Sequence, residues 1–250
     1  MASYSVRALV LRKTKLGETD VIVTLLAQDG RQLRAVAKGM RKPGSRFGGR
    51  LEPFCVVDLL LHAGRSLEVV TEAETVESFA SLREDFDRST AASVLVDVLD
   101  KTAQEGQAEE RVFAMAEATL AVMADAPVPA LPAVVSGFLA KALAMQGYRP
   151  ELLACACCAQ EATGGRVFSL RAGGVLCPEC GADDPSTVAF TQEARDVLQA
   201  LLGMTMREIA EEPFDAAALR ECFSLLRAFA AYHLPARLKA LDFYAGSVFT

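Results

Sequence analysis

Residues 6–38 read VRALVLRKTKLGETDVIVTLLAQDGRQLRAVAK, and this stretch decides the fold of the N-terminal part of the chain. Three aliphatic and β-branched runs, at 6–12, 20–26 and 31–38, predict three strands. Asp29-Gly30 separates the second run from the third, and glycine accepts the positive φ of a tight hairpin turn. Two further apolar runs follow at 54–61 and 66–73, joined by Ala63-Gly64-Arg65. Five short strands in succession predict a small closed β-barrel of the oligonucleotide-binding (OB) kind.

The segment between the third and fourth predicted strands, residues 39–50, is cationic and rich in glycine. Four glycines and Pro43 do not favour a helix or a strand, so we expect a mobile loop beside a groove of the barrel. The segment lacks the order of glycines and lysine that cradles a nucleotide triphosphate. Phe47 has two interpretations, a ring that stacks on a base and a ring that anchors the loop in the core. The cations of the loop are Arg41, Lys42, Arg46 and Arg50.

Charge is distributed unevenly along the chain. The 250 residues have a net charge of −6, but residues 1–50 hold 11 Lys or Arg against Glu18, Asp20 and Asp29, a balance of +8. The other residues therefore carry −14. This asymmetry is typical of a basic module that binds a polyanion and is mounted on an acidic scaffold, although a solvated basic face is the simpler alternative. No apolar run is long enough to predict a membrane span.

From about residue 75 the apolar period becomes helical. Residues 93–104, 108–124 and 132–146 show apolar side chains at three- and four-residue intervals and predict three helices. Thr191 and Asp215 are expected N-caps of two later helices, which run to Leu202 and Leu234, and Pro235 opens a last turn.

Two C-x-x-C turns, Cys155 to Cys158 and Cys177 to Cys180, predict a zinc site. We expect one structural Zn²⁺, because four thiolates leave no position open for water or substrate. Disulfides are the alternative, but no signal peptide is visible and the seven cysteines are an odd number, so a reducing cytosol is expected. Cys157 is a competing ligand that we interpret as a bystander.

The zinc segment should be a β-ribbon knuckle framed by Gly164-Gly165 and Gly173-Gly174. The expected fold class is α+β and multidomain, with an N-terminal OB-fold barrel and a C-terminal helical bundle that carries the inserted four-cysteine knuckle. Its segments are 1–78 (barrel), 79–150 (first helical part), 151–186 (zinc insertion) and 187–250 (second helical part). We expect Cys55 and Cys222 in the core, and His62 and His233 as surface or capping groups.

Taken together, the motifs resemble the RecO family of bacterial recombination mediator and DNA repair proteins. The resemblance covers nearly the whole chain, with the motifs in family order. The matching stretches are Val10-Leu11, Gly17-Glu18-Thr19-Asp20, Ala37 to Lys42, Ser45 to Gly49, Leu51 to Phe54, the Cys155 and Cys158 pair, Phe168-Ser169, Gly173 to Cys180, and His233 to Phe243.

The resemblance implies a non-enzymatic protein that binds single- and double-stranded DNA and anneals complementary strands. It further implies that the protein loads RecA with the partner RecR on DNA coated by the single-strand binding protein SSB, in the cytoplasm at the nucleoid. Many members lack the cysteines, so zinc is not expected to be needed for the shared activity. The residues expected to bind DNA are Arg12, Lys13, Arg34, Lys38, Arg41, Lys42, Arg46, Phe47 and Arg50.

Two other predictions concern partners and competing function classes. The acidic C-terminal tail of SSB needs an apolar pocket rimmed by cations. An adaptor whose basic loop binds a protein partner remains the alternative, because OB-folds serve both uses. An enzyme is not favoured, since the sequence has no open metal site, no phosphate loop and no Ser-His-Asp order. Candidate cations for the SSB tail are Lys141, Arg149, Arg227, Arg237 and Lys239.

Overall fold

The computed structural model describes residues 3–64, 66–104, 108–162 and 167–248. The chain divides into two compact units, Met1–Asp125 and Ala126–Thr250, and each is described by itself. The boundaries of the four segments expected from the sequence stay a prediction.

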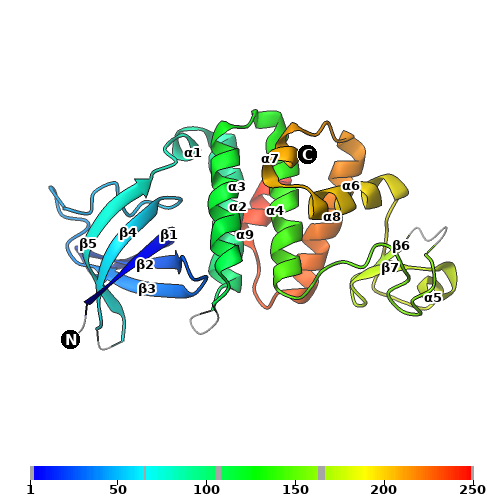
Figure 1. Cartoon of the computed structure of the whole chain (residues 1–250), viewed down its shortest axis with the longest axis horizontal. Coiled ribbons are helices and arrows are strands. Elements are labelled where there is room, and N and C mark those ends of the chain that lie inside the picture. The colour runs from blue at the N-terminus through cyan, green and yellow to red at the C-terminus, as the bar shows by residue number, and fades with distance from the viewer. Residues whose placement is uncertain (1–2, 65, 105–107, 163–166, 249–250) are drawn as a thin grey trace. The chain divides into compact units, whose positions relative to one another are not determined.

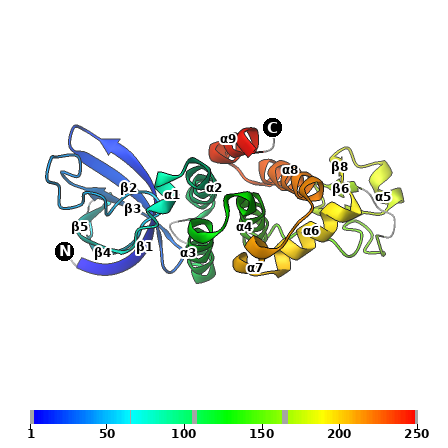
Figure 2. The ribbon, with the colours of Figure 1, turned by 90° about the horizontal axis from the view of Figure 1, so that it is seen from above.

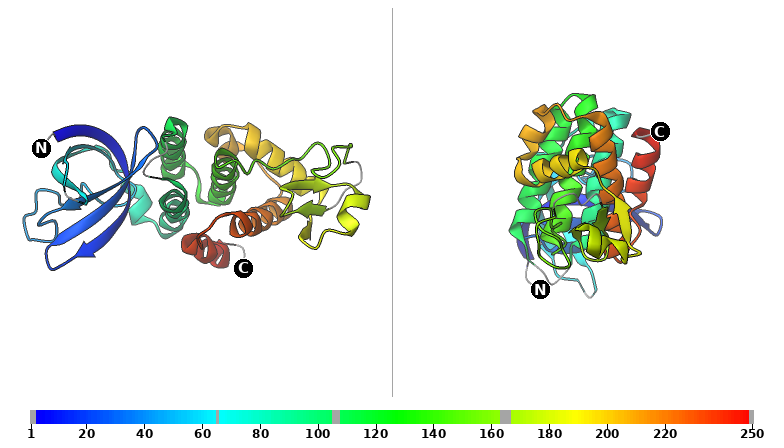
Figure 3. Two further views of the ribbon diagram at one scale, coloured as in Figure 1. Left: turned by 90° about the horizontal axis from the view of Figure 1, so that it is seen from below. Right: turned by 90° about the vertical axis from the view of Figure 1, so that its right-hand side faces the viewer.

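The first unit is built on a closed five-stranded barrel (Figure 1). Strand order is β1-β2-β3-β5-β4, with antiparallel pairs except for the parallel pair of β3 and β5. This confirms the barrel, and the strands curl round to close it (Figure 3). The strands are β1 (Ser3–Leu16), β2 (Asp20–Ala27), β3 (Gln32–Ala37), β4 (Val56–His62) and β5 (Glu68–Glu77).

Alternating side chains fill the barrel. Val23, Leu25 and Ala35 point inward and are fully buried, as are Val10 and Val57 on the neighbouring strands. Each such side chain, once removed from water, stabilises the fold by roughly 1.5–3 kcal/mol for the larger aliphatic residues. A bulge between Val10 and Arg12 shifts the register of β1 against β2.

Residues 39–55 differ from the mobile loop expected from the sequence. They form a succession of backbone turns, in which the amides of Lys42, Ser45 and Gly48 each donate to the carbonyl three residues earlier, at 3.1 Å. Phe47 and Leu51 within these turns are 1% and 0% exposed and belong to the barrel core. Its own apolar side chains therefore attach the segment to the barrel, and mobility of the exposed residues between them stays a prediction.

Three helices lie in the described residues of the first unit. Helix α2 begins earlier than its apolar period suggested, because the Asp85 carboxylate accepts a hydrogen bond from the Arg88 amide and caps it. The Arg12 guanidinium forms an ion pair with Asp100 of α2, at 3.2 Å, and the Gln32 side-chain amide donates to the Asp100 carbonyl at 3.0 Å. These bonds fasten α2 to β1 and β3. The helices are α1 (Ser81–Glu84), α2 (Phe86–Thr102) and α3 (Glu110–Asp125).

In the second unit, helices α6, α7 and α8 pack against α4 (Figure 2). The expected caps are confirmed, since Thr191 and Asp215 accept hydrogen bonds from amides of α6 and α8. The expectation that no apolar run is long enough for a membrane span is wrong for Val128–Met145, which is apolar and long enough. However, 61% of that window is buried, as in the core helix of a folded unit. The elements are η1 (Val128–Ala130), α4 (Leu131–Met145), α6 (Gln192–Gly203), α7 (Met206–Glu211), α8 (Ala216–His233) and α9 (Lys239–Val248).

The cysteine segment forms a small module between α4 and α6. Its sheet order is β7-β6-β8, and the turn between β6 and β7 contains Gly173 at a φ of +72°. At Gly174 an added Cβ would lie 2.6 Å from the Glu151 carbonyl oxygen, so this position requires glycine. Gly164-Gly165 lies outside the described residues. The elements are β6 (Val167–Ser169), β7 (Gly174–Leu176), α5 (Pro178–Ala182) and β8 (Thr187–Ala189).

Candidate nucleic-acid interface and metal centre

The outer face of β1, β2 and β3 carries side chains in rows set by the strand register. Arg12 lies opposite Thr24, which lies opposite Arg34, so these three side chains form one row. The next row toward the β1–β2 turn continues with Thr14 and Ile22. Because alternate residues of a strand share a face, Lys38 projects beyond β3 on the same side as Arg34. The sheet thus brings cations from β1 and β3 together.

Several of the predicted DNA-binding cations bind partners within the barrel unit. Besides the Arg12 ion pair, the Lys13 ammonium lies 2.5 Å from Glu52. The Arg41 guanidinium donates to the carbonyl of Glu18 at 2.9 Å, which braces the turn between β1 and β2. The Arg50 guanidinium donates to the Arg46 carbonyl at 2.7 Å. These contacts hold the surface in shape. Carboxylates compensate the charges of Arg12 and Lys13, whereas Arg41 and Arg50 bond to neutral carbonyls and keep their charge.

Four of the predicted DNA-binding cations have no side-chain hydrogen bond or ion pair within the part of the chain that the structure describes. They are Arg34, Lys38, Lys42 and Arg46, and all four are exposed. Arg46 contacts the Phe47 ring, and the other three have no such contact. The Asp20 carboxylate nearby accepts hydrogen bonds from the Gly39 amide, at 2.8 Å, and the Thr19 hydroxyl, at 2.9 Å. These bonds, together with the charges of Lys38 and Lys42, lower the pKa of Asp20. An unpaired cationic cluster remains, which suits phosphate groups.

Phe47 is not part of the accessible surface, and the structure corrects its inclusion among the DNA-contacting residues. The ring is 1% exposed, while the Arg46 guanidinium lies 4.8 Å from the ring centroid. Of the two interpretations of this residue, the core anchor is the one the structure shows. The reason is that a chain of turns has no apolar core of its own and is attached through buried side chains, here Phe47 and Leu51.

Four cysteines form a cluster that can hold a metal ion. The sulfur atoms of Cys155, Cys158, Cys177 and Cys180 all lie within 4.8 Å of one another, and Cys158 and Cys177 are 3.9 Å apart. A zinc–thiolate distance of about 2.3 Å in a tetrahedron requires sulfur atoms about 3.8 Å apart, so the arrangement fits. Cys157 is exposed and lies outside the cluster.

Backbone amides prepare this cluster for a cation. The Cys177 sulfur accepts a hydrogen bond from the Cys180 amide, at 3.5 Å, at the start of α5. Burial opposes the charged form of Cys155, but hydrogen bonds from the amides of Cys177, Cys158 and Cys157 outweigh it and lower the pKa of Cys155 to about 6. Hydrogen bonds to the neighbouring sulfurs raise the pKa of Cys180. One thiolate is therefore available before a metal arrives.

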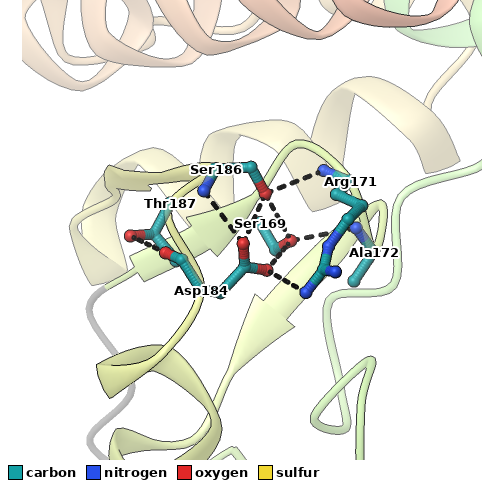
Figure 4. Close-up of polar contacts among 6 residues, drawn as sticks. All are labelled: Ser169, Arg171, Ala172, Asp184, Ser186 and Thr187. Carbon is teal, nitrogen blue, oxygen red and sulfur yellow. Dashed lines mark hydrogen bonds and ion pairs between the residues drawn. The ribbon is translucent and has the colours of Figure 1, made fainter.

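A hydrogen-bond network around Asp184 also holds the cysteine module together, and it was not predicted from the sequence. The Asp184 side chain is buried and accepts hydrogen bonds from the hydroxyls of Ser169, at 2.5 Å, and Ser186, at 2.7 Å (Figure 4). The Arg171 guanidinium lies 3.6 Å from the same carboxylate. These bonds join β6 to the segment between α5 and β8. The only sequence signal for them is Asp184-Pro185-Ser186, a turn-forming order.

Aromatic contacts attach this sheet to helix α8. The Phe168 ring packs edge-on against Phe229, with centroids 5.4 Å apart. The His233 ring nitrogen Nε2 lies 2.7 Å from the Leu170 carbonyl and donates to it. The surface position expected for His233 is therefore wrong, because its ring is half-buried and links α8 to the sheet. This link does not depend on the cysteine cluster.

A cavity of about 610 Å³ lies between α8 and α9. Ala231, Leu234 and Leu238 line it with apolar surface, and Arg227 and Arg237 lie at its wall. Both guanidiniums form ion pairs with Asp242, at 3.3 and 2.7 Å. Of the five cations suggested for the SSB tail, these two line the cavity, and Lys141 instead donates to the Leu202 carbonyl at 3.1 Å.

Comparison with known proteins agrees with this architecture. Residues 1–79 match the family model described as Recombination protein O N terminal, and residues 83–242 match Recombination protein O C terminal. The chain is 32% identical to a DNA repair protein RecO of Desulforamulus reducens, with 97% of this chain and 94% of the relative covered. It is 38% identical to one of Nocardioides, over 96% and 98%, and 37% identical to one of Frankia casuarinae, over 97% and 98%.

Proposed function

The chain belongs to the RecO family of DNA repair proteins, and on that premise we propose that it is a recombination mediator in the cytoplasm. It binds single- and double-stranded DNA and anneals complementary strands. With RecR it helps to load RecA on DNA coated by SSB. The protein does this without enzymatic chemistry of its own.

The observation that carries the proposal is the cluster of unpaired cations at Arg34, Lys38 and Lys42, beside the row that Arg12 begins. Two DNA strands repel each other, so a surface that neutralises phosphates on both lowers the barrier to pairing. Release of condensed counterions supplies affinity without sequence preference. The acidic remainder of the chain, at −14, repels DNA and confines it to this surface.

We assign one structural Zn²⁺ to the four-cysteine cluster. The ion supplies four strong bonds that tie the turn at Cys155 to the start of α5, and it leaves no coordination position for a substrate. Removal of the metal should loosen the knuckle and leave DNA affinity of the barrel unchanged, because the cations described above lie in the other compact unit.

We place the SSB tail in the cavity between α8 and α9. Its apolar wall accepts the hydrophobic end of the tail, and the carboxylates of the tail replace Asp242 at Arg227 and Arg237. An Arg237→Ala change should weaken binding of a synthetic tail peptide and leave binding of bare DNA unchanged. A peptide affinity that Arg237→Ala does not alter would move the tail elsewhere.

Titration of a single-stranded oligonucleotide against salt tests the proposal. If about four to six phosphates are contacted, the logarithm of affinity should fall with the logarithm of salt with a slope of about −3 to −5. A slope near zero would contradict the DNA-binding function. Partner capture from cell extract that survives nuclease treatment would then favour the adaptor, whose basic loop binds a protein.

A further inference from the structure

The outer face of the barrel carries an aliphatic row beside the cationic one. Ile22 lies opposite Val36, and Val36 lies opposite Val69 of β5, so three β-branched side chains line up across three adjacent strands. Thr14 of β1 begins the row. These side chains do not point into the barrel, because Val21, Val23, Ala35, Ala37 and Val70 fill it from the alternate positions.

The row is partly exposed, although it lies on a sheet face that is buried further along. Thr24, which is two residues after Ile22 on the same face of β2, is 1% exposed. Ile22, Val36 and Val69 all keep solvent-accessible surface. The ion pair between Arg12 and Asp100 fastens α2 one row away from Ile22. The three side chains of the row are only partly buried, so part of their apolar surface stays in contact with water.

Cations lie on both sides of the row along β3. Arg34 precedes Val36 by two residues and Lys38 follows it by two, which places each about 7 Å away along the strand. Neighbouring strands are about 4.8 Å apart, so the three aliphatic side chains span roughly 10 Å. That is the extent of one or two bases, and successive phosphates of an extended single strand can reach the two flanking cations.

We propose that the aliphatic row of Ile22, Val36 and Val69 is a platform for the bases of single-stranded DNA whose phosphates lie at Arg34 and Lys38. This inference rests on the proposed DNA-binding function and adds the part of DNA that the sheet contacts. Charge complementarity favours DNA as the occupant, since Arg34 and Lys38 flank the row along β3, β3 itself holds no Asp or Glu, and the nearby Asp20 carboxylate is already engaged by the Gly39 amide and the Thr19 hydroxyl.

The platform differs from the aromatic surfaces on which single strands commonly stack. Among the described residues of the five strands, Tyr4 is the only Phe, Tyr or Trp, and it lies opposite Leu61, while the imidazole of His62 ends β4 opposite Val69. Aliphatic side chains contact one face of a base through apolar packing, so no aromatic stacking interaction has to be broken when the base leaves. Bases held this way remain free to exchange neighbours, which suits a protein that pairs strands and then releases them.

The test compares an oligothymidylate with an abasic phosphodiester strand of the same length and charge. Wild type should bind the oligothymidylate about fivefold more tightly, as expected when roughly one buried methylene is at stake on each of two side chains and contact is partial. The double variant Ile22→Thr with Val36→Thr keeps β-branched strand residues and should lose this preference while its salt slope stays unchanged. A matched control, Val76→Thr with Val128→Thr, alters two exposed valines elsewhere and should behave as wild type.

Each other outcome overturns the inference in a distinguishable way. Equal wild-type affinity for both strands would mean that bases are not contacted, while DNA binding itself would stand. A preference that persists in the folded double variant would place the bases on another surface. Failure of wild type to bind either strand would remove the proposed function as well. Ile22→Tyr provides an independent check, because an added ring on the platform should increase the preference for oligothymidylate, and an unchanged preference would contradict the site.

Discussion

Removal of the unpaired cations should change the salt dependence of DNA binding by a calculable amount. The change is Arg34→Gln with Lys38→Gln and Lys42→Gln, three exposed residues without an internal partner in the described chain. Each phosphate contact on a single strand contributes about 0.7 to the slope of log affinity against log salt, so three lost contacts reduce it by about 2. At about 0.1 M monovalent salt the same loss corresponds to roughly a hundredfold weaker binding.

Fluorescence anisotropy of a labelled single strand, recorded over a salt series, measures this slope. The control variant removes three exposed cations of the second unit, Arg149, Arg207 and Arg220, and so changes the net charge equally. Its slope should match wild type. The reasoning is refuted if both variants shift the slope equally, because general charge would then decide binding, or if the barrel variant leaves the slope unchanged.

Three further predictions concern the Phe47 core position, the metal cluster and the hydrogen bonds of Asp184. Phe47→Ala should destabilise the protein by about 3–5 kcal/mol in urea unfolding, since the ring is 1% exposed, and a stable variant that loses DNA affinity would instead restore the base-stacking interpretation. Zinc binding measured by calorimetry at pH 7, in buffers of different ionisation enthalpy, should release two or more protons. The reason is that Cys158 and Cys180 have raised pKa values and must lose their protons to bind the metal. Binding without proton release would argue against thiolate ligands. Asp184→Asn should lower Tm at pH 7, because hydrogen bonds from Ser169 and Ser186 hold the pKa of Asp184 well below its usual range. The carboxylate therefore stabilises the fold above the unfolded pKa of about 3.9, and the difference in Tm from wild type should shrink as the pH falls through the folded pKa. A difference in Tm that does not depend on pH would contradict this role of the carboxylate.

The parts of the fold that depend on local pattern were predicted from the sequence. Alternation and the Asp29-Gly30 turn indicated the barrel, and the side chains of Thr191 and Asp215 marked helix starts, because each acts on residues next to it. The two C-x-x-C turns indicated the metal cluster for the same reason: each pair has a fixed local geometry.

What sequence reasoning missed depends on partners distant in the chain. Whether a cation is free is decided by residues such as Asp100, which lies 88 positions from Arg12 and pairs with it only in the fold. Phe47 could not be assigned because a turn-rich segment has no period from which to infer burial. Asp184 needed Ser169, which β6 brings to it across 15 residues.

We propose that the cationic barrel surface makes this chain a mediator of strand annealing. The most direct measurement is annealing of complementary oligonucleotides coated with SSB, by wild type and by the variant lacking Arg34, Lys38 and Lys42, with thermal unfolding to establish that both are folded. Wild type should anneal the strands, and annealing should collapse in the folded variant. Equal annealing by both proteins, or none by wild type, would contradict it.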